Sequence, residues 1–333
     1  MTNSRGRTTW LLVLLLPLAF LSAILVGRYG IRVEETFRAL FGLDGVSEVF
    51  RALVLRVRLP RALAAACIGA NLAVSGAAFQ GLFRNPLVDS RILGVSSGAA
   101  FGAAVALLIS AGTVGLQALA FVFALLAVGL VCLIGLCFGS SPLVLVIGGI
   151  LISALFNALL GLVKYVADPL SSLPAITYWL LGGLSQARWE TIGPLLAVTG
   201  GGLVFFHVIR WRLNVLSLSD SEATAMGIRI RGLRAFVITA GTILIASSVA
   251  VAGMIGWIGL VVPHVARAWV GPDHGRMIPV SAALGAITVL TLDAIARTAM
   301  ASEIPLGILT GLIGVPAFFI LFLQFLQSRG EVR

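Results

Sequence analysis

The chain has 333 residues, of which 59% are hydrophobic and 11% charged, and its mean hydropathy is +1.08. A soluble globular domain carries about 25% charged residues, so this chain has too few charges to cover a water-facing surface and is excluded from that class. The net charge of +10 comes from arginines scattered between apolar runs, which favours lipid headgroups or an acidic protein partner over nucleic acid.

Apolar runs bounded by charge, glycine or proline predict an all-α integral membrane protein with about ten transmembrane helices. The runs are too long for barrel strands, which alternate over roughly ten residues. The eighth run is too short to cross bare lipid, so we expect a half-helix buried among its neighbours. The predicted spans are 10–27, 61–82, 93–109, 114–138, 143–166, 191–208, 233–254, 257–268, 277–297 and 306–327.

The first run follows Arg5 and Arg7 and continues from Trp10 to Val26. A positive start before an apolar run is also typical of a signal peptide, but signal h-regions span about 7–15 residues and end in a small-residue cleavage site. No such site follows here. We therefore interpret the run as a retained helix with its N-terminus in the cytoplasm, and ten crossings place the C-terminus there too.

With this orientation, thirteen basic residues lie inside and ten outside, a weak positive-inside bias. Seven of the ten outer residues fall in one segment, 28–61. Two interpretations of this segment stay open. The arginines bind an acidic docking partner, or the segment's own acids partly neutralise them while their side chains lie along the membrane surface. Those acids are Glu34, Glu35, Asp44 and Glu48.

A faint internal repeat is present. The sequence AVSG at 73–76 ends ten residues before Pro86, and AVAG at 250–253 ends ten residues before Pro263. The two copies leave the membrane on opposite sides in the predicted topology, which is the pattern of an inverted repeat in transporters. With four matched positions, a chance match is the competing interpretation.

The chain lacks the residues that energy coupling or catalysis would need. Its one lysine, Lys164, is not part of a nucleotide-binding P-loop. Its one mid-helix acid, Asp293, lies four residues before Arg297, which favours a structural ion pair over ion coupling. The histidines are far apart and the cysteines lie in apolar runs, so we expect no metal site. These residues are His207, His264, His274, Cys67, Cys132 and Cys137.

The segment 211–234 is the longest loop predicted on the cytoplasmic side. Ser219 or Asp220 can cap a helix there, and Gly227 would end it, so we expect a short helix from about Ser221 to Met226. A short exposed helix is suited to docking into a groove of a partner protein. The alternative is an ordinary interfacial loop.

Several long stretches together resemble one known family, the FecCD/BtuC-like binding-protein-dependent ABC transporter permeases. They are RLPRALAAACIGANLAVSGAAFQGLFRNPLVDSRILGVSSGAAFG (58–102), YWLLGGLSQARW (178–189), LSLSDSEATAMGI (216–228), GWIGLVVPHVARAWVGPDHGRMIPVSAALGA (256–286) and LDAIARTAMASEIPLGILTGLIGVPAFFILFL (292–323). The resemblance covers nearly the whole chain, in order.

The resemblance implies a single transmembrane permease domain over 1–333 with the type II importer fold. It also implies a homodimer in the cytoplasmic membrane of a bacterium or archaeon. Two separate ATP-binding subunits would join it on the cytoplasmic side and use ATP and Mg, and one periplasmic or lipid-anchored binding protein would dock outside. The chain itself would bind no cofactor and no nucleic acid, and it would not be an enzyme.

Roles for particular residues also follow from the resemblance. The arginines of the RLPR and D-x-x-A-R segments would form salt bridges with acidic groups of the binding protein. A turn at 139–142 would form the cytoplasmic gate. The loop 216–228 would contact the ATPase. The docking residues are Arg58, Arg61 and Arg297, with Arg56 as a further candidate. The coupling residues are Ser217, Ser219, Asp220, Ser221, Glu222, Ala223, Met226 and Gly227. The gate residues are Ser140, Ser141, Pro142 and Leu143, and Asn157 is expected to face the pathway.

Such permeases import ferric siderophores, haem or cobalamin. The outer loop ADPLSSLPAITYWLLGG (167–183) is also similar to branches that carry oxyanions such as molybdate. A metal chelate, as ferric siderophore or haem, is the first hypothesis, with cobalamin or an oxyanion as the alternative. A secondary transporter driven by an ion gradient is a rival from another class, and the shortage of buried acids argues against it. An intramembrane enzyme lacks a catalytic constellation.

Overall fold

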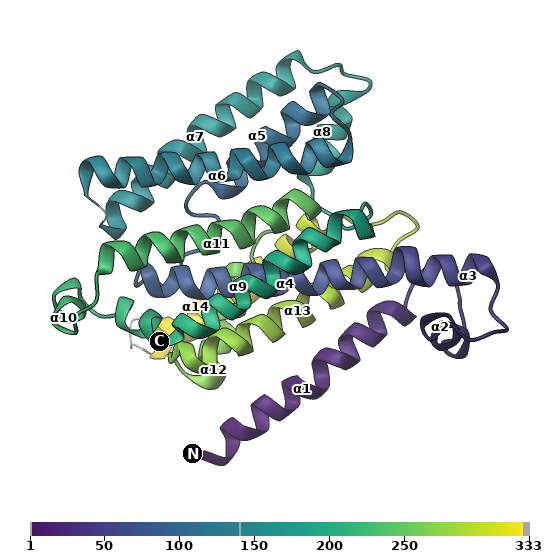
Figure 1. Ribbon diagram of the computed structural model, residues 1–333, viewed down its shortest axis with the longest axis horizontal. Helices are drawn as coiled ribbons and strands as arrows, with labels where there is room; N and C mark the ends of the chain where they lie inside the picture. The colour runs from purple at the N-terminus through teal and green to yellow at the C-terminus, as the bar shows by residue number, and fades with distance from the viewer. Residues whose placement is uncertain (1, 140, 329–333) are drawn as a thin grey trace.

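The computed structural model describes residues 2–139 and 141–328, and this part of the chain contains helices and no strand (Figure 1). Each of the ten predicted spans is found as a helix, which confirms the all-α membrane architecture. The helices are α1 (Thr2–Leu25), α4 (Leu59–Leu82), α5 (Val95–Leu108), α6 (Gly112–Phe138), α7 (Pro142–Val166), α9 (Trp189–Leu216), α11 (Ile230–Ala252), α12 (Ile258–Val270), α13 (His274–Thr298) and α14 (Leu306–Ser328).

Short helices join these spans. They are α2 (Val33–Leu40), α3 (Glu48–Leu53), the π-helical turn η1 (Val54–Arg58), α8 (Ser172–Leu180) and α10 (Asp220–Ala225). Among the described helices, seven are long and apolar enough to cross a membrane, and three apolar helices are shorter. The 13-residue α12 is one of these three and lies against α4 and α13, which confirms the predicted half-helix.

Helix α4 lies at the centre of the bundle and is buried along nearly its whole length. It packs against α13, α11, α9 and α12. Two crossings bring backbones into direct contact. A Cβ added to Gly69 would lie 2.0 Å from the Gly285 carbonyl oxygen, and one added to Gly76 would lie 1.9 Å from the Gly259 oxygen. Glycine is therefore required at these crossings, as in other tightly packed membrane helices.

Helices α5, α6 and α7 form a second layer beside the central bundle, joined to it through α11 (Figure 1). Three phenylalanines, one from each helix, fix this layer. The ring centroid of Phe101 lies 5.0 Å from that of Phe123 and 5.7 Å from that of Phe156. Such edge-on and tilted ring contacts are favourable in a packed core. The second layer is therefore a packed unit of its own.

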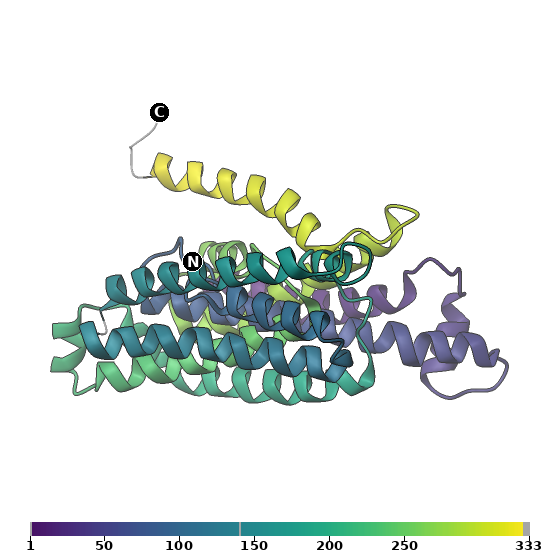
Figure 2. The ribbon, with the colours of Figure 1, turned by 90° about the horizontal axis from the view of Figure 1, so that it is seen from above.

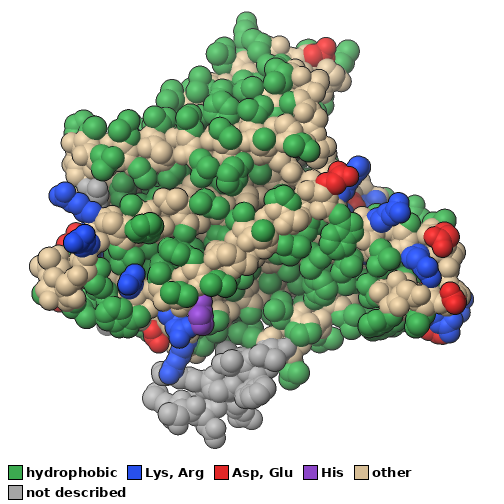
Figure 3. Space-filling model, in the orientation of Figure 1, with side chains coloured by type: hydrophobic (Ala, Val, Ile, Leu, Met, Phe, Trp, Pro, Cys, Tyr) green, Lys and Arg blue, Asp and Glu red, His purple; other side chains and the backbone are tan. Residues whose placement is uncertain are grey.

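The two ends of the bundle differ in structure. Helix α10 lies at one end, where α1 begins and α14 ends, while α2 and α3 lie at the opposite end (Figures 1 and 2). We refer to these as the α10 end and the α2 end. On the face seen in Figure 3, charged side chains gather toward both ends and hydrophobic ones cover the middle. This distribution fits a helix bundle in a bilayer, with charges at the two membrane surfaces.

The predicted repeat has different local structure in its two copies. Residues 73–76 lie inside α4, whereas residues 250–253 straddle the end of α11, where Gly253 takes a φ of +67°. Pro86 follows α4 in a turn, and Pro263 lies inside α12. An inverted relation between the two halves stays a prediction.

Candidate docking and coupling sites

The RLPR segment lies within a continuous helix. Helix α3 and turn η1 run directly into α4, so the helical run is Glu48–Leu82 and the predicted start at residue 61 is wrong. Pro60 explains the π-helical turn, because proline has no N–H and its ring clashes with the carbonyl four residues earlier. The N–H of Leu59 accordingly binds the Val54 oxygen, five residues back.

Arg58 caps the end of α1. Its guanidinium donates hydrogen bonds to the carbonyl oxygens of Ile24, Leu25 and Tyr29 at 3.0, 2.9 and 2.6 Å. The last carbonyls of a helix have no partner within the helix, and a cation is favourable there. Only 4% of Arg58 is exposed. Its side chain therefore belongs to the junction between α1 and α4.

Arg61 sits between two carboxylates. Its Nε donates to Asp293 at 3.0 Å, and its two terminal nitrogens donate to the two oxygens of Glu303 at 3.1 and 3.0 Å. The second arrangement is bidentate, the strong geometry for arginine and a carboxylate. Arg61 is 6% exposed, whereas 29% of the Glu303 side chain is exposed. The loop between α13 and α14 is thus fastened to α4 by the bond between Glu303 and Arg61.

Arg297 completes this cluster. It forms the predicted ion pair with Asp293 at 3.0 Å and also donates to the carbonyl oxygens of Ala23 and Val26 at 2.9 and 3.1 Å. Helix-end carbonyls and carboxylates of the same chain thus surround Arg58 and Arg61. Arg56 is exposed and has no ion pair with a described residue. The docking role of all four arginines stays a prediction.

Acids within the outer segment neutralise some of its arginines. Arg38 of α2 forms an ion pair with Glu34 at 2.7 Å, and Arg32 lies 3.8 Å from Glu35. Arg51 donates to the Leu43 oxygen at 2.9 Å. The structure thus supports self-neutralisation for part of this segment. Sequence reasoning missed α2, although two acids in its first turn and a basic residue in its last turn mark it.

At the other end of the bundle, α10 is a well-capped helix between α9 and α11. The Ser219 hydroxyl accepts from the Glu222 N–H at 3.3 Å, and the Glu222 carboxylate accepts from the Ser219 N–H at 2.8 Å. This reciprocal capping box confirms the predicted short helix, and Gly227 ends it at φ +77°. Hydrogen bonds from Ser219 lower the pKa of Glu222.

Asp220 connects α10 to the bundle. Its carboxylate accepts hydrogen bonds from Arg84, which follows α4, and from the buried Arg234 of α11 at 2.7 Å. Partial burial raises the pKa of Asp220, but the hydrogen bonds from Arg234 and Arg84 outweigh this and leave the pKa below its usual value. Arg84 also donates to the Leu216 oxygen at the end of α9. The Asp220 carboxylate therefore joins α10 to α11 and to the end of α4, and Arg84 adds the end of α9. We call Arg84, Asp220 and Arg234 the coupling triad.

A family model described as the FecCD transport family matches residues 14–324. The chain belongs to this family. The molybdate import system permease MolB of Haemophilus influenzae is 38% identical over 325 residues, which cover 93% of each chain. A Helicobacter pylori protein assigned as an iron chelatin transport permease is 39% identical over 280 residues, covering 84% of this chain and 83% of its own. Further relatives are named as permeases for haem and cobalamin.

A solved structure supports the same fold for the FecCD chain. It is an inward-facing conformation of a transporter assigned to the metal-chelate ABC type, with a TM-score of 0.87 and 36% sequence identity. It covers 96% of this chain and 99% of that one. The likeness therefore extends over the complete helix bundle described above.

The coupling loop of this FecCD chain is shorter than predicted. Residues 211–216 belong to α9 and 230–234 to α11, so the connection is 217–229. Ala223 is buried, whereas Ser221 and Met226 are exposed on α10. The Ser217 hydroxyl donates to the Leu213 oxygen, one turn back in α9. The α10 segment therefore has one exposed side, at Ser221 and Met226, and one side that packs against the bundle through Ala223.

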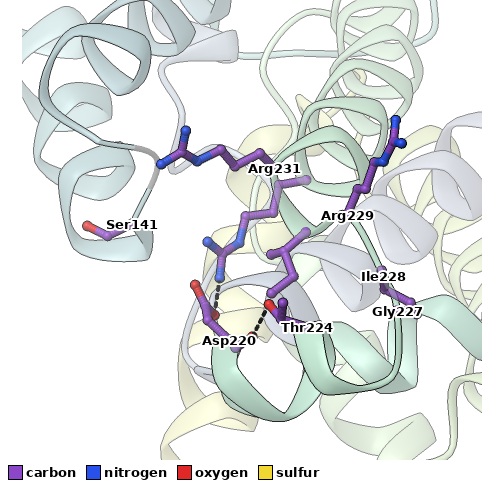
Figure 4. Close-up of a pocket in the computed structure, with 9 residues that line it drawn as sticks. Ser141, Asp220, Thr224, Gly227, Ile228, Arg229 and Arg231 are labelled. Atoms are coloured by element: carbon purple, nitrogen blue, oxygen red, sulfur yellow. Dashed lines mark hydrogen bonds and ion pairs between the residues drawn. The ribbon is translucent and has the colours of Figure 1, made fainter.

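The predicted gate is described in part. Ser140 lies outside the described residues. Ser141 caps α7 by accepting from the Val144 N–H at 3.4 Å, Pro142 is the first residue of that helix, and Leu143 is exposed. Asn157 is exposed on the same helix. Ser141 lines a cavity shared with α10 and the start of α11 (Figure 4). The gate and pathway roles stay predictions.

Sequence reasoning also missed Glu303, Arg84 and Arg234 as partners of predicted residues. Their contacts are tertiary, so spacing along the chain gives no signal for them. Cys67 is buried as a packing residue, whereas Cys137 is exposed at the end of α6. Among the described residues, no three His, Cys, Asp or Glu side chains are grouped to hold a metal ion.

Proposed function

We propose that the chain is the membrane-spanning permease subunit of an ATP-driven importer. The observation that supports this most is the coupling triad, which ties an exposed, well-capped α10 to α4, α9 and α11 of the central bundle in a chain without a P-loop. A partner that moves α10 moves α4, α9 and α11 with it. Membership of the FecCD transport family supports the same conclusion.

The proposed assembly has three kinds of component. Two copies of this chain form a homodimer, supported by the exposed apolar side chains along α7, which include Ile147, Ile150 and Leu151. Two ATP-binding subunits contact the α10 end, which would face the cytoplasm. A binding protein docks on the arginines at the α2 end. Both termini would then lie in the cytoplasm and the bundle in the cytoplasmic membrane.

Transport would follow alternating access. ATP binding to the partner subunits shifts α10, and the coupling triad passes this shift to α4 and α11. The cavity between two copies then opens to one side of the membrane at a time. In this cycle the chain makes and breaks no covalent bond, because its role is to form the pathway whose helices move.

The first substrate candidate is a metal chelate, as ferric siderophore or haem. Relatives named for iron chelatin and haem transport support it. Molybdate is the second candidate, because the relative named for molybdate import is 38% identical over nearly the whole chain and the 167–183 loop fits that branch. The ligand that co-purifies with the cognate binding protein distinguishes them: a ferric chelate supports the first and an oxyanion the second.

Reconstitution into sealed proteoliposomes tests the proposed function. We expect uptake of the ligand carried by the binding protein only when that protein, the ATPase subunits and ATP are all present. The chain alone, given a proton or sodium gradient, should show background uptake. Gradient-driven uptake by the isolated chain would establish the secondary transporter instead.

A further inference from the structure

A basic cavity lies at the α10 end, between the start of α7, α10 and the start of α11. Its volume is about 630 Å³, and Figure 4 shows Arg231 extending across it toward Ser141 while Arg229 points away. Arg229, Arg231 and Arg234 all line it, against one acid, Asp220. Asp220 is already bound by the coupling triad. The cavity therefore carries an excess of positive charge.

Among the described residues, neither Arg231 nor Arg229 has an ion-pair partner, and of the two only Arg231 extends across the cavity (Figure 4). Arg231 is exposed and has no hydrogen bond or ion pair with any described residue. Arg234, in contrast, is buried against Asp220. An arginine with a free planar fork is well suited to a phosphate group.

A second, mostly apolar crevice adjoins this cavity. It has a volume of about 380 Å³ and lies between the last turns of α6 and the first turns of α11. Arg231 and Arg234 line both spaces, so the basic cavity leads directly into the crevice. The other crevice residues are apolar or small and include Cys132, Leu136, Leu145, Ala235 and Ile238.

Large apolar side chains are exposed near the crevice. Leu136 of α6 lines it and is 79% exposed, and Phe236 of α11, next in sequence to the lining residue Ala235, is 67% exposed. Exposed apolar side chains on membrane-spanning helices are suited to contact with lipid. Arg231 lies one helical turn beyond Ala235, toward the membrane surface. Positive charge at the surface with an apolar slot beneath it matches the two halves of a phospholipid.

We propose that this paired space binds an anionic phospholipid, with its phosphate at Arg231 and one acyl chain between α6 and α11. Basic pockets between transmembrane helices on the cytoplasmic side are suited to such headgroups. The inference needs only that the chain spans a bilayer, so it does not depend on the substrate or on the ATPase. The bound lipid would bridge the second layer and α11, next to the coupling triad.

Retention of lipid by the purified full chain tests the proposal. The chain is equilibrated with phosphatidylcholine vesicles that contain a minor fraction of phosphatidylglycerol, extracted, and analysed by native mass spectrometry. Arg231→Gln removes the charge, and Ala235→Trp fills the crevice without changing charge. Arg212→Gln is the matched control, because Arg212 is an exposed arginine of α9 that does not line either space.

We expect Arg231→Gln to weaken phosphatidylglycerol retention about five-fold, because one arginine near the surface contributes about that factor. Ala235→Trp should also weaken it, while Arg212→Gln and phosphatidylcholine retention stay unchanged. Thermal melting of each variant verifies the fold. Retention by Arg231→Gln at the level of the unaltered chain would overturn the site, as would an equal loss in Arg212→Gln. If inorganic phosphate alone displaced the bound phosphatidylglycerol, the proposed binding of an acyl chain between α6 and α11 would be overturned.

Discussion

At the scale of single residues, Arg61, which is predicted to bind an acidic group of the binding protein, is already occupied within this chain. Its guanidinium already binds Glu303 through two hydrogen bonds. A carboxylate of a binding protein could reach Arg61 only by taking the place of Glu303. Because Glu303 lies in the loop that leads into α14, docking would release the start of that helix.

If a carboxylate of the binding protein replaces Glu303 on Arg61, the effect of Glu303→Gln can be predicted. We call this replacement the exchange. Removing the competing charge should strengthen docking of the binding protein roughly ten-fold, since hydrogen bonds to charged groups contribute about 1.5–3 kcal/mol. Surface plasmon resonance on the complete complex measures this affinity. Glu48→Gln is the control, because Glu48 is exposed on α3 without an ion pair to a described residue. Unchanged or weaker docking in Glu303→Gln would rule the exchange out.

Charge reversal should have different effects at Arg56 and at Arg61. Arg56→Glu alters an exposed side chain, so it should weaken docking while leaving the melting temperature unchanged. Arg61→Glu places a third carboxylate beside Asp293 and Glu303, and breaking such a buried pair costs about 3–5 kcal/mol. We therefore expect Arg61→Glu to lose folded protein, measured by size exclusion and thermal melting. A stable, fully folded Arg61→Glu variant would contradict the buried cluster.

Asp220 determines the pH range of the coupling triad. A carboxylate with a lowered pKa adds stability above its unfolded pKa, near 3.9, and this contribution is lost as the pH falls through the lower folded value. The triad should therefore stay intact from pH 8 to pH 5, with ATP-coupled uptake showing no step from Asp220. Asp220→Asn should lower coupled uptake at every pH in that range. If this variant took up ligand as fast as the unaltered chain, a role of the coupling triad in transport would be excluded.

At the scale of helices, the close crossing of α4 and α13 depends on two glycines. Gly285→Ala would place a Cβ 2.2 Å from the Gly69 oxygen, so the helices must separate. We expect a loss of several kcal/mol and poor recovery of folded protein, since small residues permit this approach. Gly129→Ala is the control, because its Cβ would meet no atom within 4 Å. Equal melting temperatures for the two variants would contradict the packing.

Sequence reasoning found the ten apolar helices because the length and limits of each apolar run mark them. It placed the ends less well: α9 continues to Leu216, beyond the predicted end at residue 208, since Arg210 and Arg212 extend past the lipid without breaking the helix. It missed α2 and α8, because hydropathy does not report short helices at the membrane surface. It found α10, because a capping residue and a terminal glycine are local signals.

The residue environments were harder to predict. The burial of the RLPR arginines was not predicted, because their partners lie far away along the chain, at the end of α1 and around Asp293 and Glu303. Likewise, Asp220 gives no sign in the sequence that Arg84 lies next to it. Pairings set by tertiary packing have no spacing rule. By contrast, the pair of Asp293 with Arg297, four residues apart on one helix, was predictable.

At the scale of the whole molecule, the bundle has one end for each proposed partner. The α2 end carries the arginine cluster joined to α1, α13 and the loop before α14. The α10 end carries the coupling triad joined to α4, α9 and α11. Helix α4 reaches both, since Arg61 lies in its first turn and Arg84 follows its last. A rigid, buried α4 is thus the shortest connection between the two ends.

In the proposed function, the energy of ATP hydrolysis enters the chain through α10. The direct test compares ATP hydrolysis and ligand uptake in the same proteoliposomes, with the complete complex and with a variant in which Ser221–Gly227 is replaced by a flexible linker of equal length. We predict that the variant still hydrolyses ATP while uptake falls to background. Uptake at the normal rate by the linker variant would contradict the account.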